Sequence, residues 1–341
     1  ITGRTGSLMR VAIVGTGVMG RVHAEAWSRT GARITAFVGK PGAGGDTLAG
    51  AYGARVATEL DAVLGEVDVV DVCTPTHLHA EFTLRAAAAG KHVVCEKPLA
   101  LTVPDGLRMI QACRTAGVRL LVAHVLRFFP EYRLARELVA RGEIGVPAVL
   151  RLSRCTFRPR KADNWYVDPA RSGGMILDLM VHDFDYARWV AGDVLRVFAR
   201  AAQITGQADE TDHALAILTH RSGAISHVEG SWAYPAPSFH TRLEIAGAAG
   251  LIEVSSPETA AVEIHLHKER ESNQEVALPG SPLQESPYAT QLRVFYEALT
   301  RGTEPPVSAE DGLAAVQIAR AAIDSARAGL PVELGSSGTL P

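Results

Sequence analysis

The chain contains little cysteine, and its cysteines are widely spaced. Four occur among 341 residues, none of them in a C-x-x-C pair, at Cys73, Cys95, Cys113 and Cys155. This spacing argues against a disulfide framework and against a zinc site, because both need clustered thiols. We therefore expect no bound metal, and we expect a reduced, cytoplasmic protein.

Long apolar runs and a strong net charge are also absent. No stretch approaches the roughly 18 unbroken apolar residues that a membrane span needs, and the formal net charge is −3. We expect neither a membrane nor a nucleic acid as a partner. Hydrophobic residues at 47% and charged residues at 21% are typical of a globular protein with a sizeable core. Residues 1–8 precede Met9 and are interpreted as an expression leader.

The first third of the chain alternates short apolar runs with helical patterns. The predicted strands are residues 11–14, 34–38, 67–72, 92–95 and 119–123, and the predicted helices are residues 18–29, 77–89 and 103–116. Short apolar strands separated by helices are typical of βαβ units and of a parallel sheet covered on both faces. The sequence therefore predicts an N-terminal dinucleotide-binding domain over residues 9–128.

After residue 128 the pattern changes. Residues 242–245 and 262–267 alternate apolar and polar side chains, which is typical of antiparallel strands with one buried face. Helical patterns interrupt at residues 131–140, 175–190, 288–299 and 309–328. We expect a second, α+β domain over residues 129–335, built on a large, open and mainly antiparallel sheet.

A glycine-rich turn directly follows the first predicted strand and opens the first predicted helix. In such a turn the first glycine permits the bend, the second lets the backbone approach a pyrophosphate, and the third lets helix and strand pack closely. The exposed N–H groups and the helix dipole then stabilise the phosphate charge. The alternative, a plain strand-to-helix turn, is disfavoured by the βαβ context. The residues assigned to cofactor binding here are Gly15, Gly17, Val18, Met19 and Gly20.

The second predicted strand ends without a carboxylate. An acidic residue there would bind the ribose 2′-hydroxyl of NAD, but the chain has Gly39 followed by Lys40. A glycine leaves room for a 2′-phosphate, which Lys40 would neutralise. This favours NADP over NAD, with a solvated Lys40 as the alternative.

Two further segments carry groups that a hydride-transfer enzyme needs. Glu96 and Lys97 precede Pro98 at the edge where open α/β sheets bind ligands, and the proline favours an extended Lys97. Asp178 and His182 lie four residues apart in the predicted helix 175–190 and therefore share a face. Each segment also has a structural alternative: Lys97 as a surface lysine, and Asp178 and His182 as ordinary polar residues of an exposed helix or as a core histidine with a carboxylate partner. With the glycine turn they indicate a site acting on an alcohol or carbonyl.

Other polar or aromatic side chains are predicted near this site. Thr74 and Pro75 end the third predicted strand, where a cofactor ribose would lie, and His79 follows at a helix start. Arg127 closes the region of the fifth predicted strand, and Trp165 is a candidate for stacking on a sugar ring. Capping or packing is the alternative for His79, and burial in the core is the alternative for Trp165.

Over nearly its whole length from Met9 the chain resembles the glucose–fructose oxidoreductase/inositol dehydrogenase (Gfo/Idh/MocA) family. The later matching groups, in this order and at these separations, are specific to that family, whereas the dinucleotide glycines are not. Many NAD-using members carry an acid at the position of Gly39, so the departure again favours NADP. The matching residues are 15–20, Cys73, Thr74, Pro75, His79, Glu96, Lys97, Pro98, Trp165, Asp168, Pro169, Ser172, Gly173, Gly174, Asp178, His182 and Asp185.

The resemblance implies a Rossmann domain and a C-terminal domain whose open sheet often forms the subunit interface, hence a homodimer or homotetramer. It implies a catalytic set in which His182 is the general base, Lys97 stabilises the reacting oxygen and Asp178 orients the substrate, and it implies that the Lys97–Pro98 peptide is cis. The expected activity is NAD(P)-dependent hydride transfer with a sugar, polyol or related alcohol. The substrate contacts are Lys97, Trp165, Asp178 and His182, and the remaining cofactor contacts are Lys40, Thr74, Pro75, His79, Glu96, Lys97 and Arg127.

Two other functions stay open within the same family. It includes glycoside hydrolases that keep NAD bound and use it transiently. It also includes a non-catalytic repressor that senses dinucleotide and sugar. The intact set of Lys97, Asp178 and His182 argues against a sensor, because a binding protein need not keep acid–base groups.

Overall fold

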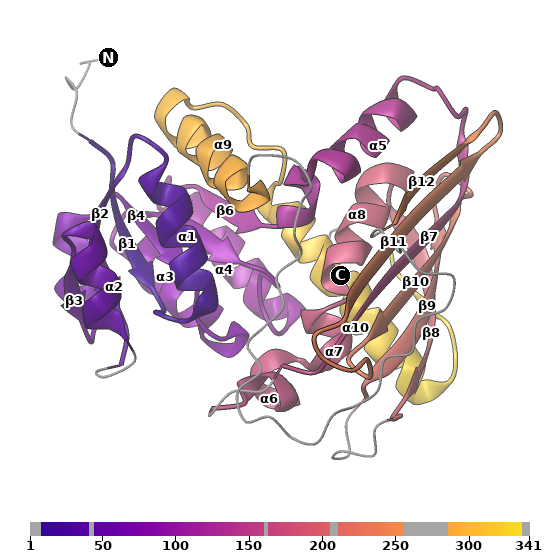
Figure 1. Ribbon diagram of the computed structural model, residues 1–341, viewed down its shortest axis with the longest axis horizontal. Helices are drawn as coiled ribbons and strands as arrows, with labels where there is room; N and C mark the ends of the chain where they lie inside the picture. Colours follow the sequence, from indigo (N-terminus) through magenta and orange to yellow (C-terminus); the bar gives the residue numbers. More distant parts are fainter. Residues whose placement is uncertain (1–7, 41–43, 160–162, 205–210, 256–285, 336–341) are drawn as a thin grey trace. The chain divides into compact units, whose positions relative to one another are not determined.

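The computed structural model describes residues 8–40, 44–159, 163–204, 211–255 and 286–335, and the chain divides into two compact units (Figure 1). Unit 1 comprises Ile1–Phe128 and Ser281–Gly312, and unit 2 comprises Phe129–Gly280 and Leu313–Pro341. Residues 1–7 of the expected leader and the expected strand 262–267 lie outside the described residues. Within the described ranges, no helix has both the length and the apolarity needed to cross a bilayer.

Unit 1 contains a six-stranded sheet in the order β3-β2-β1-β4-β5-β6, with every neighbouring pair parallel. Every residue of β4 is buried, as expected for a sheet covered on both faces. The strand order reverses between β1 and β4, so the ligand crevice is expected at their carboxyl ends. The strands are β1 Arg10–Val14, β2 Arg33–Val38, β3 Arg55–Ala57, β4 Val69–Val72, β5 His92–Glu96 and β6 Leu120–Ala123, and the helices are α1 Val18–Ser28, α2 Gly45–Tyr52, α3 His79–Ala88 and α4 Val103–Thr115.

One helix from late in the chain, α9 (Pro287–Arg301), also belongs to unit 1. It packs on α1 and on the 3-10 turn Val125–Phe128. Phe295 of α9 is fully buried and meets Phe128 edge to face, with 5.8 Å between the ring centroids. From the sequence, all residues after 128 were predicted to belong to the second domain. The structure corrects this for α9, because the apolar face of the helix is buried within unit 1.

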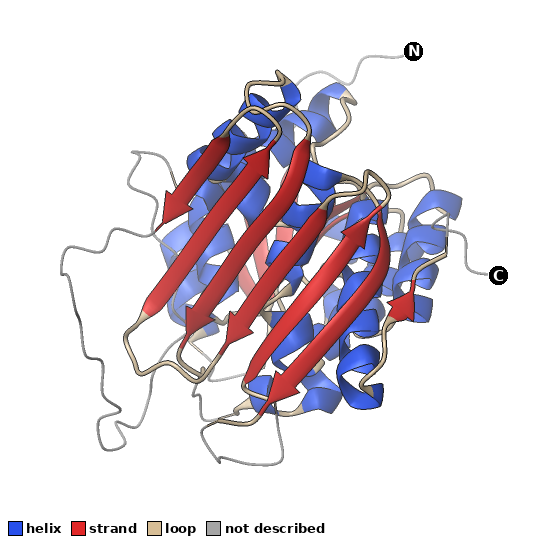
Figure 2. Ribbon diagram, turned by 90° about the vertical axis from the view of Figure 1, so that its right-hand side faces the viewer, coloured by secondary structure: helices blue, strands red, loops and turns tan. Residues whose placement is uncertain are grey.

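Unit 2 contains a seven-stranded mixed sheet in the order β12-β11-β7-β10-β9-β8-β13. The β7–β10 pair is parallel and the other pairs are antiparallel, so the expected open, mainly antiparallel sheet is confirmed (Figure 2). The strands are β7 Pro147–Thr156, β8 Val194–Ala202, β9 His213–His220, β10 Ile225–Ser231, β11 Phe239–Gly247, β12 Leu251–Ser255 and β13 Val332–Glu333, and the helices are α5 Pro130–Ala140, α6 Pro169–Ser172, α7 Gly174–Asp178 and α8 Val181–Ala191. Helix α10 (Ala309–Ala328) begins in unit 1 and belongs to unit 2 from Leu313 onward.

The predicted helix 175–190 is not continuous. It breaks after Asp178 into α7 and α8, with Leu179 and Met180 forming the turn between them. Asp178 and His182 therefore belong to different helices, and the prediction of one continuous helix was wrong. The turn coincides with close packing on the sheet: a Cβ on Gly230 of β10 would meet the Met180 side chain at 2.3 Å. Helical periodicity cannot reveal a break that depends on a glycine 50 residues away.

Candidate active site

The glycine turn after β1 has the geometry of a phosphate cradle. Gly15 has a φ of 108°, and a Cβ there would lie 2.5 Å from the carbonyl oxygen of Cys73, so only glycine fits. Gly17 begins α1 without a side-chain cap, and no atom lies within 4 Å of its Cβ position. Open space in front of an uncapped helix N-terminus fits a pyrophosphate.

A second feature at the same edge also fits a bound dinucleotide. Thr74 lies two residues after the end of β4, the strand beside β1. Its hydroxyl oxygen is buried and has no hydrogen-bond partner among the described residues. Buried hydroxyls are normally paired, so this oxygen fits a site that a ligand completes. Together with the glycine turn, it places the predicted phosphate and ribose contacts at the ends of neighbouring strands.

The end of β2 leaves little room beside Gly39 and carries basic side chains nearby. A Cβ on Gly39 would lie 3.2 Å from the side chain of Thr16, so a larger residue at position 39 meets the wall of the turn. Lys40 follows and is exposed. The guanidinium of Arg21 on α1 lies 3.6 Å from the Cβ position of Gly44, in the same strand-end loop. Arg21 was missed by the sequence analysis, although a basic residue directly after the third glycine is a usable signal.

Lys97 follows the buried end of β5 in a turn held by two hydrogen-bonding residues. The Lys97–Pro98 peptide is cis, as the resemblance implied. Glu96 accepts the backbone N–H of Lys97 at 3.0 Å. The ring nitrogens of His79 lie 2.9 Å from the carbonyl oxygens of Pro98 and Thr74, so His79 joins the turns that follow β4 and β5. Burial lowers the pKa of His79, although both carbonyls favour its charged form.

A buried polar network behind this turn was missed by the sequence analysis. His23 of α1 places Nδ1 2.9 Å from Asp71 Oδ2 and Nε2 3.0 Å from Glu96 Oε1. Trp27 donates its indole N–H to the same Asp71 oxygen at 2.7 Å. The signal was available: Asp71 is a charged residue inside a strand that is otherwise entirely valine. Such a residue needs a buried partner.

The remaining catalytic candidates belong to unit 2. Asp178 is buried at the end of α7, and His182 is the second residue of α8. The next residue, Asp183, forms a buried two-pronged ion pair with Arg154 of β7 at 2.8 and 3.0 Å, which ties the start of α8 to the sheet. Trp165 stacks on Tyr166 with ring centroids 4.0 Å apart.

Two other residues singled out in the sequence have structural roles in the fold. Gly173 has a φ of 81° and ends α6, and a Cβ there would lie 2.2 Å from the Leu177 side chain. Packing and backbone conformation therefore account for this glycine without a ligand. Arg127 is buried in the 3-10 turn after β6, where it donates to the carbonyl oxygen of Pro306 at 2.8 Å and pairs with Asp311 at 3.2 Å.

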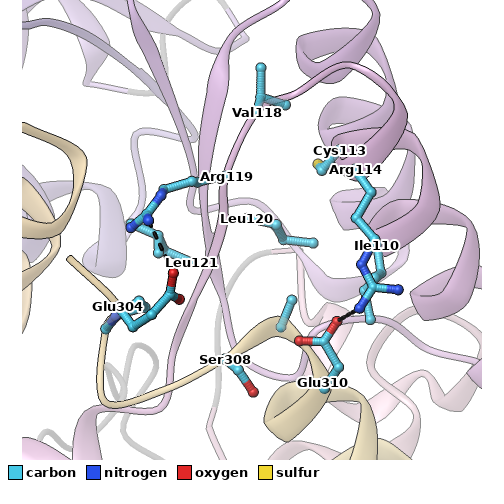
Figure 3. A pocket seen from close by; sticks show the side chains of 12 residues that line it. Ile110, Cys113, Arg114, Val118, Arg119, Leu120, Leu121, Glu304, Ser308 and Glu310 are labelled. Atoms are coloured by element: carbon cyan, nitrogen blue, oxygen red, sulfur yellow. Dashed lines mark hydrogen bonds and ion pairs between the residues drawn. The ribbon is translucent and has the colours of Figure 1, made fainter. Parts of the chain in front are cut away.

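A cavity of about 330 Å³ elsewhere in unit 1 is a separate feature (Figure 3). It lies beside Leu120 at the amino end of β6, whereas ligands bind open α/β sheets at the carboxyl ends of the strands. Its arginines are already paired, Arg114 with Glu310 at 2.6 Å and Arg119 with Glu304 at 3.2 Å. The cavity is therefore not part of the candidate cofactor site.

Profiles of two protein families match most of the described chain. The profile described as an oxidoreductase family with an NAD-binding Rossmann fold matches residues 9–124. The profile of the GFO/IDH/MocA C-terminal domain matches residues 132–253. The two matches follow the N-terminal sheet of unit 1 and most of the sheet of unit 2.

Named relatives match along most of their own length. The chain is 32% identical to an inositol 2-dehydrogenase of Rhizobium meliloti over 93% of this chain and 96% of the relative. It is 33% identical to a myo-inositol 2-dehydrogenase of Thermotoga maritima over 75% of this chain and 76% of the relative. Among solved structures, GenD2 from gentamicin A biosynthesis, in complex with NAD, has a TM-score of 0.85, 29% identity and 98% coverage of both chains.

Proposed function

Because the chain belongs to the oxidoreductase family that combines an NAD-binding Rossmann domain with the GFO/IDH/MocA C-terminal domain, we propose that it oxidises or reduces a sugar, a polyol such as an inositol, or a related alcohol. The observation that carries the proposal is the carboxyl edge of the unit 1 sheet. There the open space at Gly17, the buried Thr74 hydroxyl and the Lys97 turn follow three neighbouring strands. The inositol dehydrogenases among the relatives support a polyol or sugar substrate.

Three side chains are assigned to the reaction. When bound, the nicotinamide accepts or donates the hydride. Lys97 donates a hydrogen bond to the reacting oxygen and stabilises the negative charge that develops on it. His182 takes the hydroxyl proton during oxidation, because an imidazole ordinarily titrates near pH ~6.5 and suits this work at neutral pH. Asp178 orients the substrate hydroxyl, and Trp165 packs against the substrate ring.

NADP is the proposed cofactor in preference to NAD. The end of β2 offers no carboxylate for a 2′-hydroxyl, and Thr16 crowds the position where that carboxylate would stand. Lys40 and Arg21 instead place two cations at this strand end and its loop. Positive charge beside a glycine suits a 2′-phosphate, for which guanidinium is a strong partner.

The test of this function is a screen of cyclic polyols and aldoses with NAD and with NADP, read at the absorbance of the reduced nicotinamide. We expect turnover of at least one polyol or sugar, with a lower KM for NADP. Cofactor binding without any such turnover would contradict the proposal and favour a dinucleotide sensor. Cleavage of a nitrophenyl glycoside without net change in nicotinamide absorbance would instead favour an NAD-using hydrolase.

A homo-oligomer is proposed from the sheet of unit 2. Side chains on one face of this sheet are buried, whereas the opposite face carries Leu215 of β9, 44% exposed, and Ile225 of β10, 41% exposed. No described helix crosses the face turned toward the viewer in Figure 2. An exposed apolar sheet face is a self-complementary surface for a two-fold interface. We therefore propose a second copy of this chain as its partner.

The cytoplasm is the proposed compartment. All four cysteines are free and buried, and none of them forms a disulfide. Free thiols persist where glutathione and thioredoxin keep cysteine reduced.

A further inference from the structure

The buried network behind the Lys97 turn defines the charge state of one histidine. Both ring nitrogens of His23 face carboxylate oxygens, Nδ1 toward Asp71 and Nε2 toward Glu96. A neutral imidazole carries one hydrogen and would point its other lone pair at a carboxylate. With both carboxylates ionised, only the doubly protonated ring donates to both sides, so the geometry favours an imidazolium. Full burial opposes this charge, but the charges and hydrogen bonds of Asp71 and Cys73 together outweigh burial and raise the pKa of His23 well above its usual value.

The same geometry argues against a metal at this point. His23, Asp71 and Cys73 each place one ligand atom within 4.8 Å of the others. However, the Asp71 carboxylate already accepts hydrogen bonds from His23 and from the indole of Trp27. Burial also raises the pKa of the Cys73 thiol, whose sulfur lies 3.3 Å from Nδ1 of His23. The cluster is therefore an ion-pair network in which one cation holds two carboxylates.

The network ends at the backbone of the proposed catalytic lysine. Glu96 uses one oxygen for His23 and the other for the N–H of Lys97, at 3.0 Å in both cases. Burial opposes ionisation of Glu96, but the hydrogen bond and charge of His23 lower its pKa. Without the imidazolium, Glu96 would be a buried carboxylate with less compensation, and its grip on the Lys97 turn would weaken.

We propose that His23 is a positioning residue for the reaction: its imidazolium orients Glu96, and Glu96 orients the turn from which the Lys97 side chain extends. This inference rests on the proposed role of Lys97. In the proposed role, His23 contacts neither substrate nor cofactor and acts only through Glu96. Its effect should therefore fall on kcat, because a misplacement of a reacting group by ~1 Å can cost about 10²-fold in rate.

The charge state is tested directly by NMR of the full chain labelled with 15N-histidine. His23 is assigned by comparison with His23→Gln, and its ring nitrogens are followed from about pH 6 to about pH 9, the range in which an ordinary imidazole loses its proton. The groups facing the ring are Asp71, Cys73 and Glu96, and Glu96 is itself faced by Lys97 and His79. We expect both nitrogens to stay protonated. A neutral ring at neutral pH would overturn the proposal.

The positioning role is tested by separating turnover from cofactor binding. His23→Gln should lower kcat by about 10²-fold, while the Kd for NADPH, measured by nicotinamide fluorescence, changes less than about threefold. The matched control is His220→Gln, which alters an equally buried histidine of unit 2 bonded to Gly192 and Ser226. An equal loss of kcat in both variants would show a general structural effect and refute the positioning role.

A second variant keeps the test decisive if His23→Gln does not fold. Asp71→Asn preserves shape but removes one of the two carboxylates that hold the imidazolium. Its kcat should fall as pH rises through the new pKa of His23, with a midpoint that matches the NMR titration. A pH profile of kcat identical to that of the wild type would contradict the proposal. If the wild type turns over no sugar or polyol, the proposed function has failed, whereas the NMR spectra still decide the charge state of His23.

Discussion

At the scale of single residues, the carboxyl edge of the unit 1 sheet holds buried ionisable side chains. Burial without a partner would favour their neutral forms. Transferring one ion into a protein interior costs several kcal/mol unless a partner compensates it. His23, Asp71 and Glu96 compensate one another at 2.9 and 3.0 Å, and all three are buried. A fully paired network of this kind rigidifies its surroundings, which suits a turn from which Lys97 is proposed to hold a reacting oxygen in place.

Removal of either proposed catalytic side chain should affect turnover far more than cofactor binding. Lys97→Ala removes the donor to the developing alkoxide, and His182→Ala removes the general base. Each should lower kcat by about 10²-fold or more, with the Kd for NADPH largely retained. The measurement is steady-state kinetics on the substrate found by the screen, and near-normal turnover in both variants would refute these assignments.

Cofactor choice should depend on a single cation. Lys40→Ala should raise the KM for NADP by about tenfold, the effect expected for one hydrogen bond to a charged group. The KM for NAD should change little, because NAD lacks the 2′-phosphate. Lys91→Ala is a suitable control, since Lys91 precedes β5 at the amino end of the strand. An equal effect of Lys40→Ala on both cofactors would remove Lys40 from the site.

At the scale of elements, the α7–α8 region is organised by contacts to the sheet. The turn at Leu179 and Met180 lets the Met180 side chain pack on Gly230 of β10. The first turn of α8 is then tied to β7 by Arg154 and Asp183, whose side chains are 3% and 1% exposed. The position of His182 at the start of α8 thus depends on a buried ion pair in the neighbouring residue.

This ion pair should be important for stability. Asp183→Ala leaves the Arg154 guanidinium buried without its carboxylate, and we expect a loss of about 3–5 kcal/mol in the free energy of unfolding. The matched control is Glu137→Ala on α5, whose partner Arg133 is 56% exposed and whose ion pair should contribute only about 0–1 kcal/mol. Urea unfolding followed by tryptophan fluorescence measures both. Similar losses in the two variants would contradict the argument.

At the scale of the whole molecule, the unit 2 sheet carries the surface that we propose for contact with a second copy of the chain. Its outward face places Ile225 opposite Thr219 and Leu215 opposite Glu229, so apolar and polar side chains alternate across the β9–β10 pair. A mixed face of this kind can remain in solution as a monomer during folding. It also exposes Leu215 and Ile225, the apolar side chains that the proposed interface would bury.

Charge on this face should disrupt the proposed oligomer. The double variant Leu215→Lys, Ile225→Lys places like charges on the interface, and we expect the molar mass measured by light scattering to fall to that of one chain at micromolar concentration. Leu134→Lys is the control, because Leu134 is 52% exposed but lies on α5. A wild-type protein that is already monomeric would contradict the proposal.

Local pattern was sufficient for the architecture of both units. Runs of valine and isoleucine in β1 and β4 predicted buried parallel strands, and the alternation at residues 242–245 predicted a one-faced strand that the structure places in β11. The glycine turn and the Lys97 turn were predicted for the same reason: each strand end and its turn residues lie within a few consecutive positions of the sequence.

The features that the local sequence pattern did not predict depend on contacts between residues far apart in the chain. The assignment of α9 to unit 1, the break between α7 and α8 and the His23 network each depend on residues many positions apart in the chain. Periodicity describes which face of an element is apolar, but not which distant side chain that face will meet. A histidine one helical turn after a glycine carries no sign of its charge until folding sets two carboxylates beside it.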